Sequence, residues 1–303
     1  MKLLKTLPLS LVIFLLLGIT HSKIQAQSTD GKKVLKRKVA IGRFTNVTKQ
    51  SQSIFYDQEA DQLGKQAADI LATKLVASEK FILIERQDYD KIVSELEKSN
   101  TMTQNIGADF LIIGSVTELG RKTIGNQKVF SSSVKQAVEA GVSMRLVDVT
   151  TGLIIYSGEG KGSAEVQDKR VMGFGETADF DATLTDKAIG AAINQLVENI
   201  INSCMDKPWQ AYILAEDEGS LIISGGETQG IAAGDVYGVL SPGKKVKNPQ
   251  TGITIELPGK VVGKITIDMT IGDTPQNEVS MATLTEGEVD MENLSKYRIV
   301  ENK

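Results

Sequence analysis

The stretch KVAIGRF at residues 38–44 predicts a short buried β-strand, because Val39, Ala40 and Ile41 form an uninterrupted apolar run. A polar segment follows as far as about Asp57, and apolar residues then recur at helical spacing. These helical positions are Leu63, Ala67, Ile70, Leu71 and Leu75. A strand followed by a loop and an amphipathic helix is the first unit of an α/β layer.

The same alternation continues along the next part of the chain. FILI at 81–84 predicts a second strand, a helix carrying Ile92 and Leu96 follows Asp88, and FLIIGSV at 110–116 predicts a third strand. Residues 146–149 and 153–156 then predict a hairpin, and residues 185–202 a last helix. We therefore expect an α/β (α+β) domain with crossover connections over residues 38–205.

The composition changes after Pro208. Short β-type runs separated by Gly/Pro turns, such as Ser241-Pro242-Gly243 and Pro258-Gly259, are typical of a small β-barrel or sandwich. We expect this second domain to span residues 209–303. The predicted strands are 220–224, 236–240, 253–257, 261–267 and 280–284.

The N-terminus predicts export. Lys2 and Lys5 precede an apolar run at 7–19 that is too short to span a bilayer, and Ala26 suits a cleavage site. Residues 1–26 are therefore predicted to be a signal peptide, with an anchored N-terminal helix as the alternative. Cleavage removes three lysines and no acid, which changes the net charge from −4 to −7. Residues 27–37 form a basic tail that is either solvated or in contact with an anionic membrane or partner surface.

The residues that are missing exclude much chemistry. The only histidine, His21, lies in the predicted signal peptide, and the only cysteine is Cys204. Dyads of the Ser-His or Cys-His type and the usual His/Cys zinc sites are therefore excluded. Cys204 closes an apolar helical pattern, which favours a buried packing thiol over a reactive one. We expect no enzyme, no cofactor, no metal and, from the acidic balance, no nucleic acid partner.

Several segments of the first domain, in order, resemble the curli-secretion channel family (CsgG/HfaB). They are 39–41, 70–75, 83–87, 107–109, 113–116 and 142–152. The second domain is similar, through Gly230–Asp235, to β-domains of envelope and flagellar accessory proteins.

The resemblance implies a ring of identical subunits in the outer membrane, in which each subunit adds β-hairpins to a shared barrel for exported proteins. It also implies a pore-constriction loop, and the matching positions here are Phe55, Tyr56 and Gln58, which do not repeat the family's motif. Packing of the two aromatic residues against the domain is the alternative. Members of the family usually carry a lipid on a cysteine after the signal peptide. Gln27 stands there instead, so we expect that the chain is not a lipoprotein.

Two segments alternate as membrane strands do, with candidate hairpins at 117–146 and 158–184. The candidate lipid-facing residues are Val134, Val138, Val142, Met172, Phe174, Phe180 and Leu184. A half-buried sheet gives the same period of two, so this alternative stays open.

The sequence therefore predicts an exported, homo-oligomeric channel subunit for fibre or adhesin proteins, in the periplasm or the outer membrane. A periplasmic scaffold or binding protein without a pore, acting on other envelope proteins, is the alternative function.

Overall fold

The computed structural model describes residues 34–48, 61–98, 107–128, 131–171, 183–250, 252 and 254–302. The first part of the chain forms one mixed sheet, with strand order β2-β1-β3-β4-β5. Its strands are β1 (Arg37–Asn46), β2 (Phe81–Ile84), β3 (Phe110–Lys128), β4 (Ser131–Asp148) and β5 (Ile154–Val171). Its helices are α1 (Gln62–Ala77), α2 (Tyr89–Lys98) and α3 (Thr183–Met205).

The strand β1 pairs in parallel with both β2 and β3, as the predicted crossover connections require. The remaining neighbours, β3 with β4 and β4 with β5, are antiparallel hairpin partners. The sheet is therefore mixed, which fits the broader α+β expectation rather than a purely crossover-connected layer.

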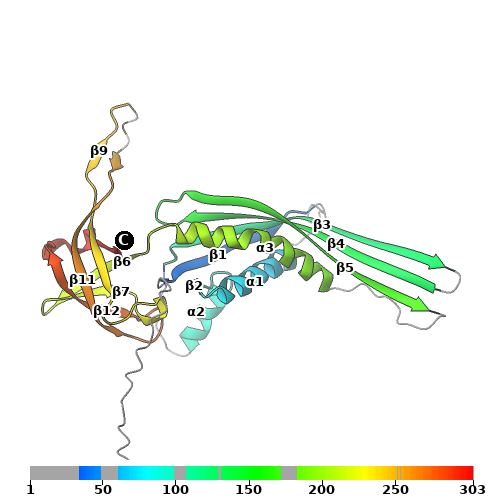
Figure 1. Cartoon of the computed structure of the whole chain (residues 1–303), viewed down its shortest axis with the longest axis horizontal. Helices are drawn as coiled ribbons and strands as arrows, with labels where there is room; N and C mark the ends of the chain where they lie inside the picture. Colours follow the sequence, from blue (N-terminus) through cyan, green and yellow to red (C-terminus); the bar gives the residue numbers. More distant parts are fainter. Residues whose placement is uncertain are drawn as a thin grey trace, which may run out of the picture. The chain divides into compact units, whose positions relative to one another are not determined.

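The core of this part lies between the sheet and the helices α1 and α3 (Figure 1). Leu71 and Leu75 of α1 are fully buried, and so are Ile189 and Ile193 of α3. The helix α1 begins at a side-chain cap, since Asp61 accepts hydrogen bonds from the main-chain N–H of Gly64 at 2.8 Å and of Asn46 at 2.6 Å. This cap ties the start of the helix to the end of β1.

The C-terminal part is a closed barrel with strand order β11-β12-β7-β6-β13-β8, as the Gly/Pro-punctuated strands predicted. The strands are β6 (Gln210–Asp217), β7 (Ser220–Ser224), β8 (Val236–Ser241), β11 (Lys260–Ile271), β12 (Val279–Gly287) and β13 (Arg298–Glu301). The ribbon β9 (Lys245–Lys247) and β10 (Thr254–Glu256) lies between β8 and β11, and the short helices are η2 (Glu227–Gln229) and η3 (Met291–Lys296).

The barrel has its own core around Trp209 and Tyr237, whose ring centroids are 5.4 Å apart. Leu35, which precedes β1, is 2% exposed and belongs to this core. The next residue, Lys36, donates its main-chain N–H to the carbonyl of Gln229 at 2.9 Å. The start of the described chain is therefore built into the C-terminal barrel.

Arg37 lies where the two cores meet, and only 3% of it is exposed. Its guanidinium donates to the carbonyl oxygens of Leu35 at 2.8 Å and of Lys207 at 3.0 Å, and one nitrogen is 3.8 Å from a carboxylate oxygen of Glu301. Burial lowers the pKa of Arg37, and the nearby Glu301 and Asp109 oppose this shift. A single buried cation thus bonds to the chain before β1, after α3 and at the C-terminus.

Candidate functional site

The strands β3, β4 and β5 continue well past the rest of the sheet. The register of β3 and β4 is recorded as far as Lys128 opposite Ser131, and Ser131 also pairs with Val171. By contrast, β1 follows β3 only as far as Val116, just before a register shift. We call residues 118–128, 131–141 and 161–171 the three-stranded extension. Figure 1 shows the ends of its strands reaching past α3.

Both outer edges of the three-stranded extension are open within the described residues. Beyond Val116, β3 pairs only with β4, and β5 is the last strand in the sheet order. An open edge presents unpaired N–H and C=O groups that can pair with a strand of another chain. The extension therefore has one bonding edge on each side.

The two faces of the long strands differ sharply. The face toward α3 is apolar and closed, with Val138, Val142, Met144 and Leu146 fully buried. The opposite face carries exposed charges in cross-strand pairs. Lys161 lies 3.1 Å from Glu118, and Lys135 lies 2.7 Å from Glu165. This face is suited to water rather than to lipid.

Glycines of β5 explain how α3 lies so close to the sheet. A Cβ atom added at Gly160 would lie 2.2 Å from the carbonyl oxygen of Ala192, and one at Gly162 would lie 2.2 Å from that of Ala188. No larger residue fits without moving the helix. This stretch is glycine-rich because it packs against α3. It does not lead directly into a helix, so it does not form a glycine-rich phosphate-binding loop.

Three of the predicted lipid-facing residues are buried in the core, so that prediction is wrong for them. Val138 and Val142 are 0% exposed beneath α3, and Leu184 is 1% exposed within α3 itself rather than in a strand. A sheet covered on one face by a helix produces the same alternation as a membrane strand, which is why the pattern misled.

The other predicted site residues are not tested by the structure. Val134 lies in β4, opposite Gly125 and Asp168, and its side chain is not described. Met172, Phe174 and Phe180 fall outside the described residues, as do Phe55, Tyr56 and Gln58. The lipid-facing and pore-constriction roles of these residues therefore stay predictions.

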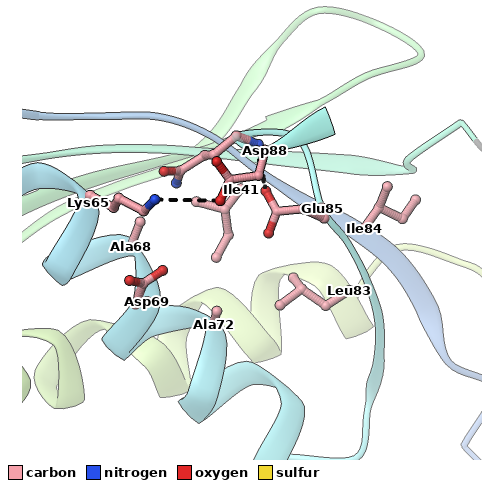
Figure 2. A pocket seen from close by; sticks show the side chains of 10 residues that line it. Ile41, Lys65, Ala68, Asp69, Ala72, Leu83, Ile84, Glu85 and Asp88 are labelled. Carbon is pink, nitrogen blue, oxygen red and sulfur yellow. Dashed lines mark hydrogen bonds and ion pairs between the residues drawn. The ribbon is translucent and has the colours of Figure 1, made fainter. Parts of the chain in front are cut away.

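A shallow hollow between α1 and the end of β2 gathers several charged groups (Figure 2). Asp88 lies 2.6 Å from Lys91 and 3.5 Å from Lys65, and these contacts, led by the hydrogen bond from Lys91, lower the pKa of its carboxyl. A carboxylate oxygen of Glu85 accepts the main-chain N–H groups of Gln87 and Asp88. These groups therefore satisfy one another and hold the start of α2.

Two further chemical observations concern the described part of the chain. No group of three or more His, Cys, Asp or Glu side chains there could hold a metal ion. The thiol of Cys204 is buried, and burial raises its pKa to about 12. A thiol in that state is a poor nucleophile.

Among the described helices, none has both the length and the apolar character needed to cross a bilayer.

Comparison with known proteins identifies the family. The model of the family "Curli production assembly/transport component CsgG" matches residues 20–237. The chain belongs to this CsgG family, which confirms the resemblance found in the sequence. Members of this family are envelope-associated transport or assembly components.

A curated relative and two solved structures are similar to the chain. "Putative lipoprotein NMB1126/NMB1164" of Neisseria meningitidis serogroup B is 32% identical over 175 residues, which are 57% of this chain and 78% of the relative. Lipoprotein GNA1162 from Neisseria meningitidis is 16% identical, with 56% of this chain and 99% of that chain covered and a TM-score of 0.26. The PelC dodecamer from Paraburkholderia phytofirmans is 15% identical, with 55% and 88% covered and a TM-score of 0.24.

Family membership rests on the family model and the sequence relative, because these TM-scores are low. The name of the curated relative also bears on the lipid anchor. It describes a lipoprotein, so the comparison gives no support to the expectation that the present chain is not one.

Proposed function

We propose that this protein is a subunit of a homo-oligomeric envelope assembly that transports or assembles exported proteins. The observation that carries the proposal is the three-stranded extension, with an open β3 edge on one side and an open β5 edge on the other. Joining the β3 edge of one copy to the β5 edge of the next is a head-to-tail contact, and such contacts form a ring when the rotation between copies closes. Three strands from one chain cannot form a closed barrel alone.

The charged face of the extension supports a water-filled interior for such a ring. Glu118, Glu139 and Glu165 are exposed there with Lys161, so the strands can line a polar passage on this side. The closed apolar face beneath α3 lies on the other side of the same strands. In this proposal an unfolded client passes through the polar side and no cofactor is used.

A scaffold without a pore is the second candidate. The observation that favours it is the burial of Val138, Val142 and Leu184, which removes three apolar residues from any lipid-facing band. The two candidates differ in the expected location of the protein and in whether the strand edges of neighbouring copies pair. Both are open to experiment with the full-length protein.

The first experiment joins neighbouring copies by a disulfide across the proposed edge contact. Ile124 and Gln167 share one face of the sheet, because both align with Lys135. Ile124→Cys combined with Gln167→Cys, or with Glu165→Cys to allow a two-residue shift, should give a ladder of covalent multimers on mild oxidation. Ile124→Cys alone is the control and should give at most dimers. Failure of every double variant to form a ladder would reject the edge contact.

The second experiment separates the two candidate functions. Membranes of expressing cells are separated and washed with urea. A channel subunit should remain in the outer membrane as a high-mass oligomer. Recovery of the mature protein in the wash would reject the channel and favour the scaffold. If the protein carries a lipid, its measured mass will reveal it. The urea wash would then be repeated on a variant in which the acylated residue is replaced.

A further inference from the structure

The ribbon formed by β9 and β10 projects from one end of the barrel (Figure 1). Its strands pair over three positions, from Lys245 opposite Glu256 to Lys247 opposite Thr254. Asn248 closes the turn, since its carbonyl accepts the N–H of Gly252 at 2.8 Å and its side chain that of Gln250 at 2.8 Å. A strand residue adds about 3.3 Å, so the three paired positions alone span roughly 10 Å. The ribbon is therefore an arm that projects from the barrel and can contact a neighbouring molecule.

The arm is strongly basic in an acidic protein. Between Pro242 and Lys260 the sequence holds Lys244, Lys245, Lys247 and Lys260 but a single acid, Glu256, while the whole chain carries a net charge of −4. All four lysines are exposed, and no ion pair involves any of them within the described residues.

The other cations of the described barrel already have partners. Lys264 lies 2.8 Å from Glu286, and Lys296 lies 2.6 Å from Asp290. The guanidinium of Arg298 lies 4.3 Å from the centre of the Tyr212 ring and donates to the carbonyl of Ser295. Unused positive charge in this domain is thus concentrated on the arm.

Unused negative charge lies at the same end of the barrel, on the opposite wall. Leu240 aligns with Arg298, and Arg298 aligns with Tyr212, so β8 and β6 run in the same direction. The arm after β8 and the turn after β6 therefore leave the barrel at one end. In the closed strand order the β6–β7 pair is opposite the β8–β11 pair.

The end of β6 carries the exposed residues Glu216 and Asp217, and Glu218 follows in the turn; we call these three residues the acidic wall. The arm cannot reach across to this wall of its own barrel without leaving its observed position. A second copy, set beside the first with the same end up, presents that wall directly. The contact is head-to-tail, which is the type of contact from which a ring is built.

We propose that the β9–β10 arm of one copy docks on the acidic wall of the barrel of the next copy. Apolar residues at the base of the arm, Leu257 and Val261, are 44% and 57% exposed and would be covered by this contact. A two-stranded ribbon is only marginally stable alone, so docking also stabilises the arm. An anionic membrane fits the arm less well, because it repels the acidic turns at the same end. The inference rests on the proposed function, because it requires that several copies assemble.

Two charge-reversed proteins test the contact. One carries Lys244→Glu, Lys245→Glu and Lys247→Glu in the arm. The other carries Asp217→Lys and Glu218→Lys on the acidic wall, with Glu216 kept because it accepts the N–H of Gly219. Each protein alone places like charges across the contact, and each should need about tenfold more protein for half-assembly, measured by sedimentation. Thermal unfolding of each monomer checks that both have folded.

Mixing the two reversed proteins should restore assembly, because each arm then meets a wall of opposite charge. Combining all five changes in one chain should restore it as well. Raising the salt from about 0.05 M to about 0.5 M should weaken the wild-type assembly. Normal assembly of either reversed protein alone, or no recovery on mixing, would overturn the inference and leave the proposed function intact. Loss of binding to phosphatidylglycerol vesicles without any loss of assembly would assign the arm to the membrane and also overturn it. A wild-type protein that never assembles would reject the proposed function and this inference with it.

Discussion

The guanidinium of Arg37 donates a hydrogen bond to the main-chain carbonyl of Lys207 at 3.0 Å, which joins residues 170 positions apart in the sequence. Arg37→Ala should lower the free energy of unfolding by about 2–4 kcal/mol, because it leaves buried carbonyl groups without their donor. Chemical denaturation of the purified protein measures this loss. Arg43→Ala, an exposed position on the same strand, is the matched control and should change stability by less than about 0.5 kcal/mol. Equal losses of stability from the two changes would contradict the stabilising role of the Arg37 hydrogen bonds.

Gly160→Val should destabilise the protein by about 1–3 kcal/mol or more, since its new side chain would collide with the carbonyl of Ala192 in α3. Gly120→Val is the control, because a Cβ atom at Gly120 meets nothing within 4 Å. Thermal unfolding should therefore separate the two variants clearly. A harmless Gly160→Val would show that α3 does not lie against β5 as closely as described.

Val138→Asp should prevent folding, or cost more than about 3 kcal/mol, in a detergent-free monomer as well as in membranes. The reason is that Val138 is 0% exposed in the core. Glu139→Asn changes the next residue on the exposed face and should leave the melting temperature nearly unchanged. A Val138→Asp monomer as stable as the wild type would restore the lipid-facing interpretation.

Cys204 should resist a disulfide reagent at pH 8 in the native protein and react rapidly once urea unfolds the chain. Burial raises the pKa of this thiol from 9.0 to about 12, so the folded state favours the protonated form. The stability due to this preference is fully present below pH 9 and falls as the pH rises toward 12. Stability should therefore fall less steeply over this range in Cys204→Ala than in the wild type. Rapid native labelling at pH 8 would show that the thiol is accessible.

Strand and helix positions in the first domain could be predicted from local patterns, but their lengths could not. Apolar runs indicated Phe81–Ile84 and the start of β3 at Phe110, since apolar residues there follow one another without a break. The segments that continue β3 to Lys128 and β5 to Val171 were predicted only as parts of candidate hairpins, at 117–146 and 158–184. Glycine and charged residues dominate these segments, and cross-strand pairing rather than propensity keeps them extended.

The start of α3 also shows that local sequence patterns do not fix where an element begins. Phe180, Ala182 and Leu184 fit a strand period, and residues 158–184 were therefore predicted to contain a hairpin. The helix begins at Thr183, where Leu184 packs into the core with Ala188. Two or three alternating residues do not distinguish a strand end from the first turn of a helix. Open strand edges and a basic arm opposite an acidic wall depend on strand order, which local sequence does not encode.

The place of Leu35 in the barrel core has a consequence for folding kinetics. Leu35 and Ile299 belong to the same core, so this core unites nearly the whole length of the described chain. Contacts between such remote positions form slowly, because a very long loop must close first. In a chain that emerges with its N-terminus first, Leu35 would stay exposed until the last strand, β13, is available. Barrel closure should therefore be the late step of folding, and during that interval the chain would be open to chaperones and proteases.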